Sequence, residues 1–267
     1  MYQGPLYLES KGWIMEKKYL LSKMTWPEVE ERLNECTTVV VPVGSTEQHG
    51  PALPVDNDHF VATQFAYRLA ERVWEEIKLV VTPTIAFGQS QHHMGFKGTV
   101  TLKKSTLASV IVDVCESLAH HGFENIVLLN GHGGNETAIQ NALHMLHDEI
   151  EARVYSMNWW SQVMDKVPDI VEGPIFHACD METSVSWYLG QRVLAEKRVD
   201  EPGKKPVPGY IEPDMRKKAP TVSSAFTMKD FTDSGVVGLS TKATMEKGGE
   251  IVELALQRMA EFIIRIS

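Results

Sequence analysis

Short segments of almost wholly apolar, largely β-branched residues alternate along this chain with segments that are apolar on one side only. The clearest of the first kind are residues 38–43, 79–85 and 126–129, and residues 153–157 give a fourth. Strands that are apolar throughout are buried on both faces, as in parallel sheets covered by crossover helices. The pattern predicts an α/β fold with a mostly parallel central sheet and helices on both faces.

The amphipathic segments predict the helices that cover this sheet. Apolar residues recur at four-residue spacing from Val61 to Val73, which predicts a helix beginning near Asp58. Further helices are expected over residues 25–35, opened by a capping box at Thr25, then from an N-cap at Ser105 to a stop at Gly122, around 139–146, and over about 242–264.

Chain length and composition suit one folding unit. With 267 residues and no internal repeat, the economical interpretation is a single domain over residues 25–267, preceded by an N-terminal extension over residues 1–24. Residues 201–220, rich in proline and lysine, are expected to form an ordered loop or lid.

Charge, cysteines and hydropathy exclude several classes of function. A formal net charge of -9 repels a phosphate backbone, so no nucleic-acid partner is expected. Three dispersed cysteines form no disulfide framework, which favours a reducing, cytoplasmic compartment. There is no signal-peptide pattern, and no apolar run approaches the roughly 20 residues that span a bilayer, so no membrane partner is expected.

Polar, histidine-bearing segments follow three of the predicted strands. Glu47, His49 and Asp58 follow the first, Ser90 and His93 the second, and His132 the third. In an open parallel sheet, functional sites form beyond the carboxyl ends of the strands. We therefore expect these side chains to share one site.

Each of these residues also has an ordinary structural interpretation. Glu47 and His49 project to one side if their loop is extended, as two ligands of one metal must. Asp58 at a helix start is equally well an N-cap, and the glycine-rich turn around His132 is alternatively a tight helix entry or an anion-binding nest. Together the four supply mixed nitrogen and oxygen ligands suited to Zn²⁺, Mn²⁺ or Fe²⁺.

Five ordered motifs resemble those of the creatininase family of metal-dependent amidohydrolases. They are Gly44-Ser45-Thr46-Glu47-Gln48-His49-Gly50-Pro51 with Asp58, the segment 88–99, Asn130-Gly131-His132-Gly133-Gly134-Asn135, the segment 177–184, and Asp233-Ser234-Gly235-Val236. The resemblance covers nearly the whole chain from about Thr25. It implies a three-layer α/β/α fold, usually a homohexamer, that binds two divalent metal ions per subunit and acts on a small molecule.

The resemblance also assigns ligands by position. One metal ion would be held by Glu47, Asp58 and His132, and the second by His49 and the shared Asp58. The creatinine-hydrolysing member adds a glutamate ligand where this chain has Gly134. We expect Glu182 of the third motif to supply the missing ligand, or else to serve as a catalytic group.

Groups that recognise creatinine in that member are largely missing here. It has a tyrosine and a glutamate where Gly133 and Gly134 stand, and a glutamate where Phe176 stands. We therefore expect little or no creatinine turnover.

The remaining candidates concern catalysis and substrate binding. His177 is expected to be the general acid or base, aided by Glu182, with a helix-capping or buried histidine as the alternative. Ser90 and His93 are expected to contact substrate, although both are also compatible with a solvated loop. Trp159 and Trp160 are expected to wall the pocket, one of them doubling as a core residue because neighbours on a strand end face opposite ways.

The leading interpretation is hydrolysis of a cyclic amide or formamide C–N bond by metal-activated water. The main alternative is hydrolytic ring-opening at a C–C bond of a cyclic polyhydroxy ketone of the inosose type. Trimming of a modified peptide would require a wider cleft near residues 201–220. A metal-stabilised binding protein without catalysis is a fourth interpretation, and it predicts metal binding without turnover.

Overall fold

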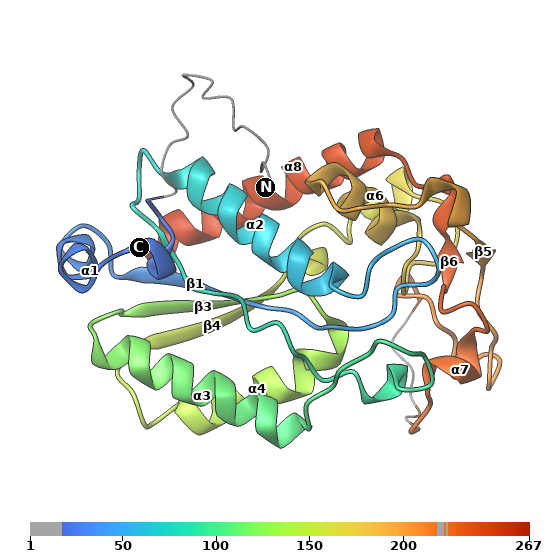
Figure 1. Ribbon diagram of the computed structural model, residues 1–267, viewed down its shortest axis with the longest axis horizontal. Helices are drawn as coiled ribbons and strands as arrows, with labels where there is room; N and C mark the ends of the chain where they lie inside the picture. Colours follow the sequence, from blue (N-terminus) through green and yellow to red (C-terminus); the bar gives the residue numbers. More distant parts are fainter. Residues whose placement is uncertain (1–17, 218–221, 223) are drawn as a thin grey trace, which may run out of the picture.

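A four-stranded parallel sheet forms the middle of three layers in the computed structural model, which describes residues 18–217, 222 and 224–267 (Figure 1). The strands are β1 (Thr38–Val43), β2 (Val80–Val81), β3 (Asn125–Asn130) and β4 (Arg153–Asn158), in the order β2-β1-β3-β4. Helices α2 (Asn57–Val73), α6 (Asp180–Leu189) and α8 (Met245–Ile266) lie on one side, and α3 (Lys104–His120) and α4 (Glu136–Leu146) on the other. The predicted α/β/α architecture is confirmed.

Each face of the sheet packs into its own apolar core. Val40, Val127 and Leu129 belong to the cluster that includes Phe65 of α2 and Ile251 of α8. Their neighbours along the strands point the other way, and the second cluster contains Val39, Val41, Val43, Ile126, Leu128, Leu107, Ile111 and Ile139. The two-residue alternation of a strand thus divides continuous apolar runs between two cores, which explains why these strands carry no polar face.

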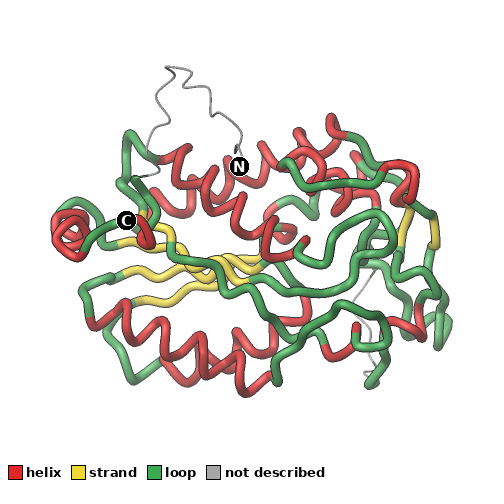
Figure 2. Tube along the Cα trace, in the orientation of Figure 1, coloured by secondary structure: helices red, strands yellow, loops and turns green. Residues whose placement is uncertain are grey.

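The strands end in register at one edge of the sheet. Val43 pairs with Asn130, and Asn130 pairs with Asn158, so three chain segments leave the sheet side by side. Figure 2 shows the loops gathered at this end, together with the short ladder of β5 (Asp200–Glu201) and β6 (Gly238–Leu239). Loops far apart in the sequence therefore meet here.

Three predicted boundaries need correction. The strand expected over residues 79–85 is reduced to β2 and an isolated bridge from Val43 to Ile85, because Pro83 has no N–H to donate to a ladder. The N-cap expected at Ser105 is wrong, since α3 begins at Lys104 and Ser105 lies in its first turn. The last helix begins at Met245, where Thr244 accepts a hydrogen bond from the Lys247 N–H, rather than near Lys242.

Part of the segment that precedes the predicted domain belongs to the apolar core. Tyr19 and Leu20 are buried, and Leu20 forms a parallel bridge with Val81. The capping box at Thr25 is present, because its N–H donates to Glu28 at 2.6 Å, and it opens α1 (Trp26–Leu33). Residues 1–17 of the extension expected over residues 1–24, and residues 218–220 of the expected lid, lie outside the described residues.

Two further features bear on the expectations drawn from composition. Cys36, Cys115 and Cys179 are free and buried. None of the helices in the described part of the chain combines the length and the apolar character that crossing a bilayer requires. Two short helices, α5 (Val167–Ile170) and α7 (Met228–Phe231), complete the fold.

Close packing of α8 on α6 generates the first prediction. A Cβ atom at Gly248 would lie 2.0 Å from the Ser184 carbonyl oxygen, whereas a Cβ atom at Gly249 would lie 3.1 Å from the Tyr188 ring. We expect Gly248→Ala to lower the free energy of unfolding by about 1–3 kcal/mol, because the helices must separate. Gly249→Ala, the matched control, should change it by less than about 1 kcal/mol because helix propensity offsets a small side-chain shift. Chemical denaturation measures both, and equal effects would contradict the packing argument.

Glu201 gives a pH-dependent prediction. Its carboxylate accepts hydrogen bonds from the Thr232 hydroxyl at 2.6 Å, from the Ser234 hydroxyl at 2.5 Å and from the N–H groups of Asp233 and Ser234. Burial opposes ionisation, but these bonds outweigh it and lower the pKa of Glu201 to about 2.

The stabilisation from Glu201 should be complete above the ordinary carboxyl pKa and be lost as the pH falls toward about 2. We therefore expect Glu201→Gln to lower the melting temperature at pH 7, and the difference from wild type to shrink between about pH 5 and pH 3. Thermal scans across this range test it. A difference that does not change with pH would show that charge on Glu201 contributes nothing.

Candidate metal centre

A cavity of about 410 Å³ opens beyond the carboxyl ends of the strands. Its floor is polar and its walls are largely apolar. The lining residues are Asp58, His92, His93, Gly131, His132, Gly133, Gly134, Glu136, Trp159, Trp160, Phe176, His177, Met181, Glu182, Met215 and Met228. The cavity is therefore where the sheet topology predicts a site.

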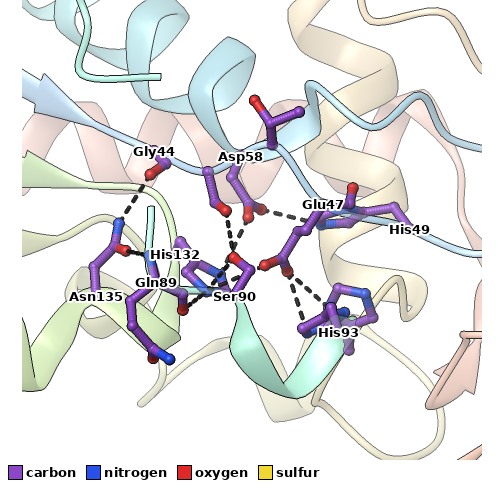
Figure 3. Close-up of polar contacts among 12 residues, drawn as sticks. Gly44, Glu47, His49, Asp58, Gln89, Ser90, His93, His132 and Asn135 are labelled. Carbon is purple, nitrogen blue, oxygen red and sulfur yellow. Dashed lines mark hydrogen bonds and ion pairs between the residues drawn. The ribbon is translucent and has the colours of Figure 1, made fainter. Parts of the chain in front are cut away.

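The sequence-predicted ligands converge on the cavity floor from four elements. Glu47 and His49 come from the loop after β1, Asp58 from the first turn of α2, and His132 from the turn after β3, and Figure 3 shows these four side chains turned toward one another. Glu182 joins them from the first turn of α6. All five are almost completely buried apart from Glu182, which remains partly exposed.

Asp58 stands at the centre of this group. Its Oδ1 lies 3.0 Å from Nε2 of His49, and its Oδ2 lies 3.1 Å from Nδ1 of His132. The N-cap interpretation of Asp58 is wrong, because Asp56 occupies the N-cap position and Asp58 lies inside α2. The two carboxylate oxygens thus face two different histidines.

Backbone carbonyls fix which nitrogen of each histidine faces Asp58. The Glu47 carbonyl lies 3.1 Å from Nδ1 of His49, and the Gln89 carbonyl lies 3.1 Å from Nε2 of His132. A carbonyl only accepts, so these nitrogens carry the protons and the opposite nitrogens carry the lone pairs. Lone pairs and carboxylate oxygens therefore face each other in a buried site, an arrangement that a cation or a second proton between them stabilises.

Unsatisfied carboxylate oxygens test whether this centre fits a metal. Oε1 and Oε2 of Glu47 and Oδ2 of Asp58 are buried without a hydrogen-bond partner. Such atoms cost several kcal/mol unless a cation or donor satisfies them. Within the described residues, possible cation ligands form three overlapping groups, each with atoms within 4.8 Å of one another: Glu47, His49 and His177; Glu47, Asp58 and His132; and His49, Asp58 and Glu182. These residues fit divalent metal ions.

The pKa values of the carboxyls and histidines in this group are shifted by burial and by one another's charges. Burial raises the pKa of the Glu47 carboxyl to about 8. For His132, burial lowers the pKa, but the negative charges of Glu47 and Asp58 outweigh it and raise the pKa to about 9. Burial also opposes ionisation of Asp58, yet His49 and His132 hold its pKa below the ordinary value. Without a cation, protons bound by the histidines balance the negative charge of the buried carboxylates.

His177 lies beside this group, and its pKa is shifted in the opposite direction to that of His132. Burial and the nearby charge of His49 lower the pKa of His177 to about 4, so its imidazole is neutral. Its Nε2 lies 2.8 Å from the Gln48 carbonyl and must donate to it, which leaves the lone pair on Nδ1. The next residue, Ala178, has a positive φ of 48°, and its N–H donates to Glu182 Oε2 at 2.5 Å. The strained turn joins His177 to Glu182.

The predicted substrate-binding residues divide into two sets. His93, Trp159 and Trp160 line the cavity, and both tryptophans also belong to the apolar core, so the expectation that only one would do so is wrong. Ser90 is fully buried, with its Oγ 3.3 Å from Nε2 of His132 and 2.5 Å from the Ser45 hydroxyl. Ser90 thus lies behind His132, and a solvated position for it is wrong.

Several residues of the site were not singled out from the sequence. His92 stacks on His132 with an interplanar angle of 11°, and Met215 and Met228 line the cavity wall. Asn135 donates to the Gly44 carbonyl and accepts from the Gln89 N–H, tying the loops after β1, β2 and β3 together (Figure 3). A histidine beside His93 was the one available signal, whereas isolated methionines carry none.

The chain is similar in sequence to characterised hydrolases. The chain is 31% identical over 265 residues to 3-dehydro-scyllo-inosose hydrolase of Thermotoga maritima, covering 90% of this chain and 81% of the relative. It is 30% identical over 236 residues to the mycofactocin precursor peptide peptidase of Mycobacterium tuberculosis, covering 85% and 86%.

Solved creatininase structures share the fold. A mutant creatininase of the Zn-Zn type superposes with a TM-score of 0.74 at 27% identity, covering 92% of this chain and 96% of that one. A Mn creatininase gives a TM-score of 0.73 at 27% identity, covering 92% and 97%. Zinc and manganese are both among the metals that the donor set predicts.

The family model of creatinine amidohydrolases matches residues 22–263. That span includes every residue assigned above to the cavity floor, and the relatives are hydrolases that cover most of their own length in the match. This chain is a metal-dependent hydrolase, and it belongs to the creatininase family.

Proposed function

We propose that this protein hydrolyses the C–N bond of a small cyclic amide or formamide at a binuclear metal centre. The observation that carries the proposal is the carboxylate of Asp58, whose two oxygens face the lone pairs of two different histidines, at 3.0 Å and 3.1 Å. Glu47 and His132 complete one ligand group with Asp58, and His49 and Glu182 complete the other.

Two divalent cations bound there would lower the pKa of a bound water toward neutrality and polarise the carbonyl under attack. The residues of the chain supply the rest. His49 and His132 are held by backbone carbonyls in the tautomers that present lone pairs. Glu182 is held by the Ala178 N–H, so its Oε1 faces His49 at 3.4 Å.

His177 is the residue proposed to move the proton. It lines the cavity and has its lone pair on Nδ1, so that atom can accept a proton from the attacking water and return it to the leaving nitrogen. His177 also belongs to a possible ligand group with Glu47 and His49. The two roles differ in consequence, because loss of a ligand removes metal and loss of a proton carrier removes only turnover.

Gly134 supports Glu182 as the ligand that replaces the glutamate of the creatinine-hydrolysing member. A Cβ atom at Gly134 would lie 2.3 Å from Nε2 of His132 and 2.4 Å from the Gln89 carbonyl oxygen. A glutamate at this position therefore has no room in the present backbone. With Phe176 also in place of a carboxylate, we propose that creatinine is not the substrate.

The cavity walls favour a substrate with a flat, weakly polar body. Trp159, Trp160 and Phe176 line it together with Met181, Met215 and Met228. Apart from the ligands and histidines, Glu136 is the one charged side chain among the lining residues that the structure describes. A polyhydroxylated ring would leave several hydroxyls facing apolar surface, which costs free energy.

Ring-opening of a cyclic polyhydroxy ketone is the second candidate. It is favoured by the 31% identity to the inosose hydrolase of Thermotoga maritima over 90% of this chain. The same metal centre serves a C–C or a C–N bond, so the wall residues decide between the two. A homo-oligomer, with a hexamer as the family expectation, is part of the proposal for the assembled enzyme.

Metal stoichiometry tests the centre directly. We expect protein reconstituted with Zn²⁺ or Mn²⁺ to hold two ions per chain, Asp58→Asn to lose both, and Glu182→Gln to lose one. Glu136→Gln is the matched control, since Glu136 lines the cavity but belongs to none of the ligand groups. Elemental analysis and the metal-induced rise in melting temperature measure the result. Two ions retained by Asp58→Asn would refute the bridging role.

A substrate panel tests the reaction. We expect the metal-loaded enzyme to turn over lactams or formamides faster than inosose-type ketones, and creatinine hardly at all. His177→Ala should keep its metal and lose turnover by a factor of about 10²–10⁴, the usual contribution of a proton-transfer residue.

Faster turnover of the ketones would transfer the assignment to the second candidate. Loss of metal from His177→Ala would make His177 a ligand. Full metal occupancy with no turnover of any amide, ketone or peptide would favour a binding protein.

A further inference from the structure

Gln48 lies between the two ligands Glu47 and His49 but points away from them, into a buried contact with three other segments. Its side-chain amide contacts Gly50, Gly235 and His93, and its backbone carbonyl contacts His177. The proposed chemistry assigns it no role, yet it is buried and polar. Buried polar groups are almost always hydrogen-bonded, so each donor and acceptor of Gln48 should have a partner.

Backbone partners determine how the amide is oriented. The Gly50 N–H donates to Oε1 at 2.9 Å, and the Gly235 carbonyl accepts from Nε2 at 3.2 Å. Backbone groups cannot exchange donor and acceptor roles, so the amide nitrogen and oxygen are fixed in place. One Nε2 proton remains, and two histidine nitrogens lie within reach of it, Nδ1 of His93 at 3.0 Å and Nε2 of His177 at 3.1 Å.

The second proton goes to His93. Nε2 of His177 already donates to the Gln48 carbonyl, so it has no lone pair to offer. Nδ1 of His93 therefore accepts, and in the neutral ring its proton is on Nε2. That nitrogen lies 3.3 Å from Oε1 of Glu47. His93 therefore presents a protonated nitrogen, and not a lone pair, to one oxygen of a proposed metal ligand.

From this chain of contacts we infer that Gln48 is a positioning residue for the metal centre. It fixes the tautomer of His93 so that a proton, and not a lone pair, lies on the Nε2 that faces Oε1 of Glu47 at 3.3 Å. Through its carbonyl, the same residue fixes the tautomer of His177 and leaves Nδ1 free. One residue thereby sets the state of a ligand and of the proposed proton carrier. This inference rests on the proposed metal centre.

Gly235 shows how closely the amide is enclosed. A Cβ atom there would lie 1.9 Å from Oε1 of Gln48, at a φ of +90°. Gly209 has a similar φ of +79°, but nothing lies within 4 Å of a Cβ atom built on it. Alanine at either position would strain the backbone, but only the new methyl group of Gly235→Ala would contact the Gln48 amide. Comparing the two variants therefore distinguishes displacement of Gln48 from backbone strain.

Zn²⁺ affinity of the full-length chain, measured by competition with a chromophoric chelator, tests the inference. We expect Gln48→Met, which keeps the length of the side chain but donates no proton, to weaken Zn²⁺ binding about 10–100-fold, as loss of an outer-shell partner does. Gly235→Ala should weaken it similarly, and Gly209→Ala should not. Because Gln48 acts through His93, Gln48→Met should have little further effect in a His93→Ala background.

The possible outcomes separate this inference from the proposed function. If wild type takes up no Zn²⁺, both proposals fail. If wild type binds Zn²⁺ and Gln48→Met binds it equally well, only the role of Gln48 fails. Additive effects of Gln48→Met and His93→Ala, or a lower melting temperature of the metal-free Gln48→Met protein with unchanged affinity, would mean that Gln48 serves packing alone.

Discussion

A buried carboxylate held between two imidazole lone pairs is the constraint on which this structure depends. Asp58 and its two histidines would repel one another if nothing positive lay between them, and burial removes the water that would otherwise moderate the repulsion. The fold brings them together through close backbone contact. A Cβ atom at Gly131 would lie 2.5 Å from the Asp58 carbonyl oxygen, so the turn after β3 can approach the first turn of α2 only as glycine.

Much of this arrangement is predictable because parallel strands end at a common edge. Glu47 and His132 follow strands that pair in register from Thr38 with Asn125 to Val43 with Asn130, so apolar runs alone place them close together. The sequence could not decide between an N-cap and a bridging ligand for Asp58, since both use a carboxylate in a helix's first turn. It also could not place Ser90 behind His132, because that depends on the path of a loop shaped by contacts with Asn135.

The floor and the walls of the cavity are built from different kinds of residue. Backbone groups hold three of the floor residues, His49, His132 and Glu182, whereas the walls come from Trp159, Trp160, Phe176 and three methionines. Methionine and aromatic side chains fill irregular space and are readily exchanged without disturbing the backbone. Relatives of this chain are named as an inosose hydrolase and as a peptidase, so substrates differ among proteins of similar sequence. Changes in the walls alter the substrate and leave the metal chemistry intact.

Helix α6, the last of the four elements that form the site, also packs against α8. Glu182 reaches His49 only because the turn at Ala178 accepts a positive φ and donates its N–H to the carboxylate. At the same helix end, Asp180 accepts from Lys247 at 2.6 Å, and one turn later Ser184 meets α8 at Gly248. Residues in unfavourable backbone conformations persist where the surrounding structure is well packed, and α6 is packed in this way against α8. The helix that carries Glu182 toward the cavity is thus packed against α8 through residues on either side of Glu182 in the sequence.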